Sequence, residues 1–112
     1  MIVSELALKK CAPCERGAPA LGSLEIERLL PSLEGWTVEG KGLTKTFKLK
    51  SFNKAIVLVN SVARVAEEEN HHPDIYIQYN KVRFDLWTHA AGGLTENDFI
   101  LAAKIDQAGA PS

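Results

Sequence analysis

Residues 74–87 alternate apolar and polar side chains around a central Asn80-Lys81 pair. Because successive side chains of a strand point to opposite faces, this alternation predicts two antiparallel strands joined by a two-residue turn. The turn pairs apolar residues on one face, namely Tyr79 with Val82, Ile77 with Phe84 and Ile75 with Leu86. The other face pairs Gln78 with Arg83, Tyr76 with Asp85 and Asp74 with Trp87. A slip of one residue would mix the two sets, so the pattern favours this register.

A long amphipathic helix is predicted directly before this hairpin, from Ser51 to about Asn70. Its apolar residues recur at spacings of three and four, as in a helix that buries one face. They are Phe52, Ile56, Val59, Val62, Ala63 and Ala66. Residues 67–69 are three glutamates in the last turn, where the helix dipole favours cations instead. A local rule broken at one place is typical of a functional site.

Two further segments complete a repeated order of hairpin and helix. Residues 36–49 alternate around a turn at 39–42 and predict an earlier hairpin, although Lys45 interrupts its apolar side. Residues 95–108 predict a final helix with Thr95 as N-cap and Asp98 at its third position, a variant of the capping box. The chain is therefore predicted to be a two-layer ββαββα domain of the α+β class. Its helices would cover one face of a four-stranded antiparallel sheet.

The N-terminal part is predicted to be an irregular arm followed by an extra helix. Residues 1–22 are rich in Gly, Pro, Ala and Lys. From Ser23, taken as an N-cap, apolar residues lie near one helical face until Pro31 ends or kinks the helix. They are Leu24, Ile26, Leu29 and Leu30. The predicted organisation is an arm at 1–22, one domain at 23–108 and a tail at 109–112.

Cys11 and Cys14 form a C-x-x-C pair within this arm. A redox dithiol needs the motif between a strand and a helix, and a zinc site needs four ligands. The sequence has no second such pair. An exposed, reduced pair is favoured, and half of a metal site completed by a second chain stays open.

The overall charge argues against nucleic acid as a partner, and the length of the apolar runs argues against a membrane span. The 112 residues hold 13 Lys and Arg and 14 Asp and Glu, a net charge of −1. This is not the basic excess of a nucleic-acid binder. No apolar run approaches the roughly 20 residues of a membrane helix. The first lysines follow the apolar stretch instead of preceding it, which is the wrong order for a secretory signal, so a cytoplasmic protein is expected.

All three histidines fall close together in the predicted fold. His71 ends the long helix, and Pro73 forces His72 into extended backbone at the start of the strand. The predicted register then places His72 opposite His89. Imidazoles titrate near neutral pH, so one can donate a proton while another accepts one. Trp87 adds a flat surface for an aromatic ligand. Ordinary structural roles for these residues, or zinc held by the three histidines, stay open as alternatives.

The spacing of these residues resembles the signature of the pterin-4a-carbinolamine dehydratases. The matching positions are Glu67, His71, His72, Pro73, Tyr79, His89 and Asp98. The stretch 88–106 is also similar to that family, and the resemblance extends over about residues 20–108. It implies the same ββαββα fold with an extra N-terminal helix. Ile75 departs from the animal members, which carry Trp there, so stacking on the substrate is weaker or is taken over by Trp87.

The resemblance implies a hydro-lyase that removes water from a 4a-hydroxytetrahydropterin to give a quinonoid dihydropterin. The reaction recycles tetrahydrobiopterin and needs no metal or organic cofactor. His71 and His89 are implied as the acid–base pair, and His72 as the residue that holds the substrate. The implied substrate-binding residues are Glu67, Asn70, Trp87, Thr88 and Asp98. Asp98 would also orient His89.

Two other functions stay open. Members of this family also act as dimerisation cofactors of a transcription factor, and plastid relatives act in enzyme assembly. A homodimer or homotetramer is expected, with the long helix or an open sheet edge as its interface and no direct contact with nucleic acid. The third reading is a metal protein that uses the histidines, with or without Cys11 and Cys14.

Overall fold

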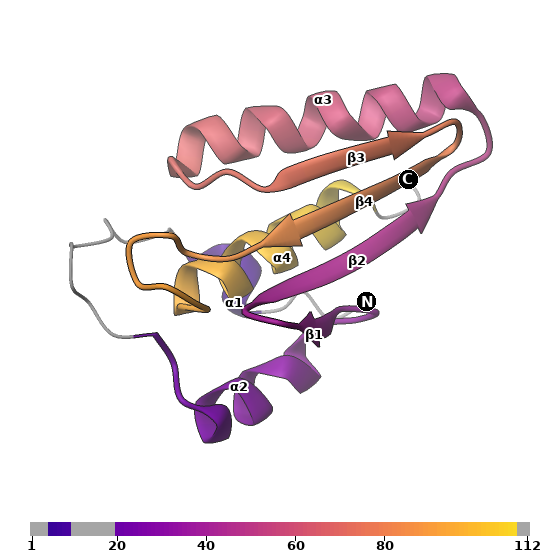
Figure 1. The fold of residues 1–112 in the computed structure, drawn as a ribbon. Coiled ribbons are helices and arrows are strands. Elements are labelled where there is room, and N and C mark those ends of the chain that lie inside the picture. Colours follow the sequence, from indigo (N-terminus) through magenta and orange to yellow (C-terminus); the bar gives the residue numbers. More distant parts are fainter. Residues whose placement is uncertain (1–4, 10–19, 110–112) are drawn as a thin grey trace.

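The computed structural model describes residues 5–9 and 20–109 (Figure 1). In that part the elements are α1 (Glu5–Leu8), α2 (Ser23–Leu29), a 3-10 turn η1 (Leu30–Ser32), β1 (Thr37–Glu39), β2 (Gly42–Lys48), α3 (Phe52–Glu69), β3 (Asp74–Gln78), β4 (Lys81–Leu86) and α4 (Glu96–Ala108). The strands form one antiparallel sheet in the order β1-β2-β4-β3. The predicted α+β architecture is confirmed. Cys11 and Cys14 lie outside the described residues.

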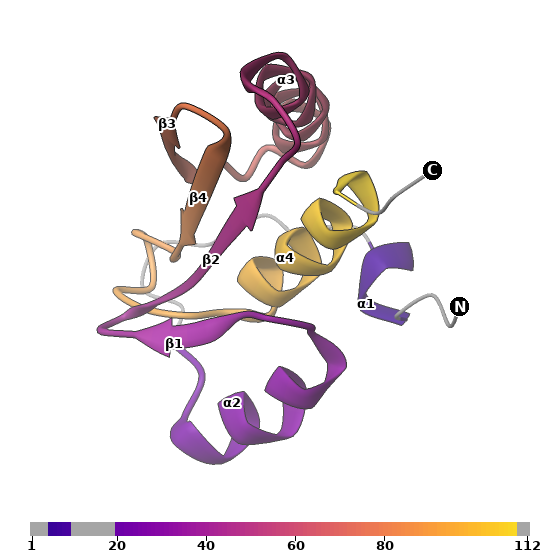
Figure 2. The same ribbon diagram turned by 90° about the vertical axis from the view of Figure 1, so that its right-hand side faces the viewer.

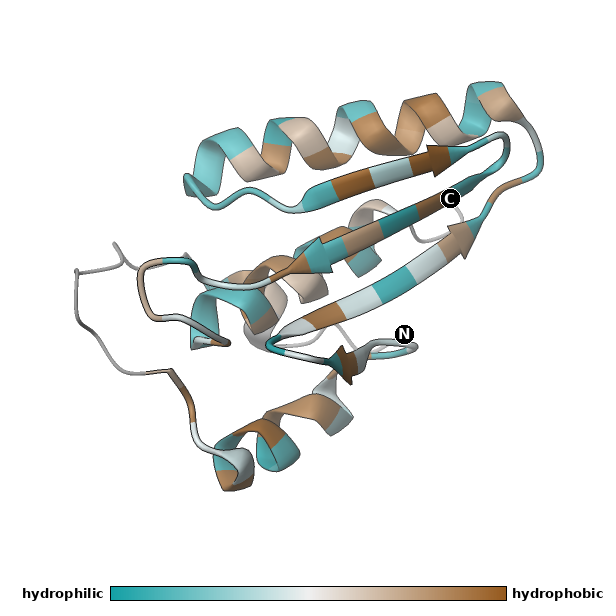
Figure 3. Cartoon of the chain, viewed as in Figure 1, coloured by the Kyte–Doolittle hydropathy of each residue, from teal (hydrophilic) through white to brown (hydrophobic). Residues whose placement is uncertain are grey.

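Helices α3 and α4 lie on the same side of the sheet, and α1 lies against α4 (Figure 2). Fully buried side chains fill the space between these layers. The largest are Phe84, Phe99, Leu43, Leu86, Ile100, Leu101 and Ile105. Apolar and polar residues alternate along β3 and β4 (Figure 3), so the sheet turns its polar face away from the helices. None of the described helices is long and apolar enough to cross a membrane.

The β3–β4 hairpin has the predicted faces, but its register is two residues away from the predicted one. Ile75 pairs with Phe84 and Asp74 pairs with Asp85. A shift of two residues leaves every side chain on its original face, which is why the apolar side still meets the helices. The pairing ends at Asp74, so His72 is not a strand partner of His89.

The turn occupies Tyr79 and Asn80, where Asn80 and Lys81 were predicted. Tyr79 has a φ of 53° and is exposed, instead of facing the helices. Asn80 is fixed by Leu49, because its side-chain amide donates to the Leu49 carbonyl at 2.9 Å and its own carbonyl accepts from the Leu49 N–H at 2.7 Å. This long-range anchor, which no local pattern reveals, sets the turn.

Helix α3 is confirmed, and its buried face agrees in part with the predicted one, since Val62 and Ala66 are buried as predicted. Ser51 caps it by accepting from the Lys54 N–H at 3.1 Å. The buried residues are Ala55, Leu58, Val62 and Ala66. Phe52 and Ala63, predicted to be buried, are exposed. The reason is that α3 packs more against α4 than against any single strand, which rotates the buried stripe.

The N-terminal region differs from the prediction in two places. Residues 5–8, predicted to be irregular, form α1, and the Lys104 ammonium of α4 donates to the Ala7 carbonyl at 2.8 Å. Ser23 is the first residue of α2 and not its N-cap, which is Gly22. The α-helix gives way to η1 before Pro31, as predicted.

Lys45 faces the helices despite its charge, because α4 supplies a partner. Its ammonium donates to the Asp106 carboxylate at 2.7 Å and to the Glu34 carbonyl at 2.6 Å. The Trp36 indole donates to the same carboxylate oxygen at 2.9 Å. A half-buried charge is tolerated when it is paired in this way.

Replacing Asp106 with alanine is expected to lower the free energy of unfolding by about 1–2 kcal/mol, since the buried Trp36 indole and the half-buried Lys45 ammonium lose their acceptor. Denaturant unfolding followed by circular dichroism measures the loss. The matched control is Asp106→Asn, which keeps an acceptor for Trp36 and should lose less. Equal unfolding midpoints for Asp106→Ala and the original chain would show that the cluster contributes nothing.

Candidate active site

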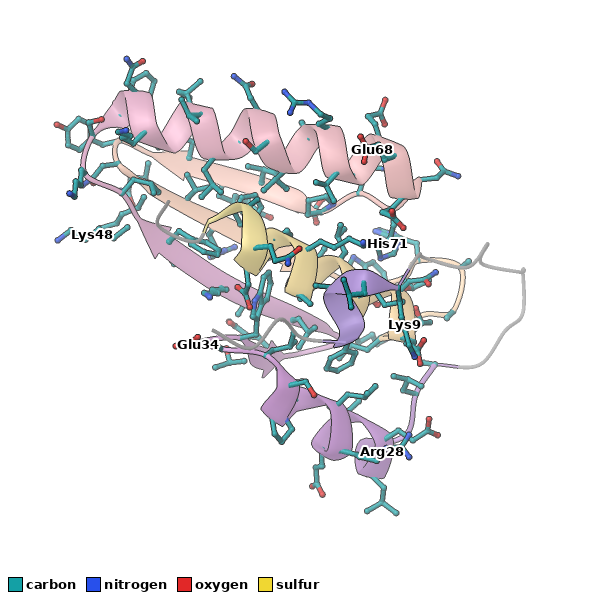
Figure 4. The ribbon with its side chains drawn as sticks, turned by 180° about the vertical axis from the view of Figure 1, so that it is seen from behind. Lys9, Arg28, Glu34, Lys48, Glu68 and His71 are labelled. Atoms are coloured by element: carbon teal, nitrogen blue, oxygen red, sulfur yellow. The ribbon has the colours of Figure 1, made fainter. Side chains whose placement is uncertain are left out.

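His71 is placed by the way in which α3 ends. Asn70 adopts the left-handed conformation with a φ of 52°, and the N–H of His71 bonds to the Ala66 carbonyl at 3.1 Å. These are features of a Schellman ending, which reverses the chain direction. Figure 4 shows His71 below the C-terminal end of α3. Only 11% of its side chain is exposed. The visible contribution of Asn70 is therefore its backbone, which positions His71.

The Asp98 carboxylate, completely buried, joins three segments of the chain. One oxygen lies 2.6 Å from Nε2 of His71. The other oxygen accepts from the Thr88 hydroxyl at 2.8 Å and from the Thr95 N–H at 2.9 Å. Because a carboxylate only accepts, His71 donates from Nε2, which leaves Nδ1 as the nitrogen available to a ligand.

The predicted partnership between Asp98 and His89 is replaced by one between Asp98 and His71. The capping role of Asp98 is confirmed, since it closes the capping box with Thr95. Its link to His89 is indirect and runs through Thr88, the residue immediately before it. The sequence correctly predicted Asp98 at the start of α4. It did not predict that the end of α3, which carries His71, packs beside that position.

His89 lies in the loop that follows β4. The buried Thr88 bridges to Gly93, with its N–H donating to the Gly93 carbonyl at 2.9 Å. The His89 side chain is exposed, and its ring centroid lies 3.9 Å from that of Trp87. Within residues 5–9 and 20–109, no hydrogen bond or ring contact joins His89 to His71.

His72 and Glu67 form a separate pair at the surface. Nε2 of His72 lies 2.5 Å from a Glu67 carboxylate oxygen, and both side chains are more than half exposed. The contact orients the imidazole from the last turn of α3. Glu67, implied by the resemblance as a substrate-binding residue, is thus paired with His72.

A groove of about 380 Å³ opens on the polar face of the sheet. The start of β3 contributes Asp74, and the end of β4 contributes Asp85 and Trp87. Arg83 also lines it and donates to Asp85 at 3.1 Å, and the negative charge of the aspartate raises the pKa of the guanidinium. Trp87 connects the groove with His89, on whose ring it packs.

Sequence reasoning predicted Thr95 as a helix cap but missed the groove and the contact between Thr95 and Thr88. The Thr95 hydroxyl lies 2.8 Å from that of Thr88, so both threonines support the Asp98 carboxylate. A polar residue such as Thr88, at a position that continues a buried strand, is the signal that could have indicated this network. In the part of the chain that the structure describes, no three His, Cys, Asp or Glu side chains form a metal-binding group.

A sequence model of the family described as pterin 4 alpha carbinolamine dehydratase matches residues 19–108. The chain belongs to this family of hydro-lyases. A relative from Nitrosospira multiformis is 47% identical over 104 residues, which are 93% of this chain and 92% of that protein. A relative from Rubrobacter xylanophilus is 44% identical over 106 residues, 94% of this chain and 99% of that protein. Both carry the name "Putative pterin-4-alpha-carbinolamine dehydratase".

Solved structures of dehydratase-like proteins have the same fold. A transcriptional coactivator/pterin dehydratase from Brucella melitensis superposes with a TM-score of 0.78 at 34% identity, covering 81% of this chain and 99% of that one. A pterin dehydratase-like protein, described as a RuBisCO assembly factor in the alpha-carboxysome, gives a TM-score of 0.60 at 27% identity. It covers 70% of this chain and 94% of the other.

Proposed function

We propose that this chain dehydrates 4a-hydroxytetrahydropterins to quinonoid dihydropterins, as a step in tetrahydrobiopterin recycling. The observation that carries the proposal is the buried Asp98 carboxylate. One of its oxygens holds His71, and the other holds Thr88, which precedes His89. Asp98 thus holds the His71 imidazole directly and anchors, through Thr88, the segment of chain that carries His89. Family membership supplies the substrate class.

The reaction needs one proton donor and one proton acceptor. The C4a–O bond breaks as the hydroxyl takes up a proton and leaves as water. The adjacent ring nitrogen loses its proton and forms the new C=N double bond. Asp98 holds Nε2 of His71 and leaves Nδ1 free, which suits the group that accepts the nitrogen proton. His89, exposed beside Trp87, donates the proton to the hydroxyl, and His72 holds the substrate with Glu67 behind it.

Absorbance spectroscopy tests the activity. A 4a-hydroxytetrahydropterin is generated chemically, and formation of the quinonoid product is followed with and without the purified chain. Catalytic amounts of protein are expected to raise the rate above the spontaneous one, in proportion to protein concentration. A folded protein that leaves the spontaneous rate unchanged would contradict the proposal.

The names of the two solved relatives support a second, non-catalytic role in assembly or transcription for the same scaffold. Such roles require an interface with another protein chain. We also propose that this chain forms a homodimer or homotetramer. The edge strand β3 has unpaired backbone groups, and Ile77 on it is 44% exposed. Unpaired edges invite strand pairing with another copy.

Ile77→Lys is expected to reduce the mass of the particle in sedimentation equilibrium to that of a single chain, because a charge would be buried at the interface. The control is Val38→Lys on β1, the other edge strand, where the side chain is 42% exposed. It should leave the mass unchanged. Equal masses for all three proteins would show that β3 is not the interface.

A further inference from the structure

The groove on the polar face contains a carboxylate that the fold does not use. Asp74 is exposed at the start of β3 and lines the groove. Its side chain has no hydrogen-bond or ion-pair partner among residues 5–9 and 20–109. Its neighbour Asp85 has two, since it accepts from the Thr44 hydroxyl at 2.6 Å and from Arg83 at 3.1 Å.

The position of Asp74 is unfavourable for the sheet. Asp74 and Asp85 are direct partners in the β3–β4 register and lie on the same face. Directly opposed residues have β-carbons roughly 5 Å apart, and like charges there destabilise the strand pair. The Arg83 guanidinium compensates Asp85, with which it shares a hydrogen bond, but not Asp74. An uncompensated charge of this kind indicates a functional demand.

Trp87 gives the same groove an aromatic surface. Its side chain is half-buried and lines the groove beside Asp74. Gly42 forms the adjoining wall, where an added β-carbon would lie 2.7 Å from the Leu86 carbonyl. Any side chain at position 42 would therefore push the end of β4 away and displace Trp87.

We propose that Asp74 and Trp87 recognise the aminopyrimidine edge of the pterin. The ring N–H and the exocyclic amino group of a pterin are adjacent donors. A carboxylate can accept from both at once, as it does from a bidentate guanidinium. Trp87 would stack on the ring. The inference rests on the proposed function and deepens it, because it names the group that selects the amino-substituted heterocycle.

The spacing along the chain suits a single bound ring system. Asp74 follows His72 by two residues, which span roughly 7 Å of extended chain, about the length of a two-ring heterocycle. In the same groove, Trp87 packs on His89 with ring centroids 3.9 Å apart. A pterin whose amino edge lies on Asp74 would thus direct its reacting carbon toward the histidines.

Binding of two matched ligands tests the inference. The probes are 7,8-dihydrobiopterin and the corresponding lumazine, in which a carbonyl oxygen replaces the amino group. Isothermal titration calorimetry is expected to show about 10- to 100-fold tighter binding of the pterin, as lost charge-assisted hydrogen bonds predict. Asp74→Asn should abolish this preference. The control Glu68→Gln, on the exposed surface of α3, removes one negative charge elsewhere and should keep it.

The outcomes separate this inference from the proposed function. An Asp74→Asn protein that still prefers the pterin by the original factor would overturn the inference, while turnover by the original chain would stand. Absence of both turnover and pterin binding in the original chain would overturn both. Thermal unfolding is the check on folding. Asp74→Asn relieves repulsion from Asp85 and should unfold at the same or a higher temperature, whereas a lower temperature would assign Asp74 a structural role instead.

Discussion

His71→Ala is expected to lower kcat for pterin dehydration by about 100- to 10,000-fold, the range for losing a general acid or base. The side chain lies at the end of α3 and one of its nitrogens is held by Asp98 at 2.6 Å. Because the Schellman ending uses only backbone groups, α3 should still end at Asn70. Steady-state kinetics measure the loss, and circular dichroism checks the helix content.

His71→Gln sharpens this experiment. Glutamine can donate a hydrogen bond to Asp98 but cannot exchange a proton near neutral pH. It should therefore recover the stability that alanine loses, without recovering kcat. Substantial turnover by His71→Gln would show that position 71 only binds or packs, and would move the acid–base role elsewhere.

Asp98→Asn is expected to keep the fold but reduce kcat by about 100-fold or more, as observed when the orienting aspartate of a catalytic triad is replaced by its amide. The amide can still accept from Thr88 and Thr95. Its NH₂ group would then donate to Nε2 of His71, which moves the ring proton to Nδ1. The imidazole would present a proton where the reaction needs an acceptor.

Asp98→Ala should in addition lower the free energy of unfolding by about 3 kcal/mol, because three buried donors lose their acceptor. The two variants together separate positioning from stability. Denaturant unfolding and kcat are measured on both. If Asp98→Asn had normal kcat, the tautomer of His71 would have no importance and Asp98 would be a helix cap alone.

Local patterns predicted the elements of this fold well, because each element depends on nearby residues. The alternation around 74–87 identifies two strands and their faces, and spacings of three and four identify α3. The predicted register of the β3–β4 hairpin was wrong by two residues, because Asn80 is held by Leu49, which is distant in sequence. The charge of Lys45 on the apolar side of the first hairpin had no explanation in the local sequence, because its partner, Asp106, belongs to the last helix.

The sequence supplied candidate residues for the site but not the contacts between them. The residue pattern shared with the dehydratase family indicated His71, His89 and Asp98, and the capping box predicted Asp98 at the start of α4. Which histidine receives its carboxylate depends on how the end of α3 packs beside α4, and no periodicity encodes that packing. Asp74 was overlooked because an aspartate at the start of a strand has no distinctive local pattern.

We propose that Asp98 couples His71 and His89 into one acid–base unit, and a double-mutant cycle on kcat/KM tests this coupling most directly. His71→Ala, His89→Ala and the double variant are compared with the original chain for dehydration of the same 4a-hydroxytetrahydropterin. Groups that act as a unit are strongly non-additive. The double variant is therefore predicted to be about as slow as the slower single variant. Losses that multiply would mean that the two histidines act independently and would contradict the coupling through Asp98.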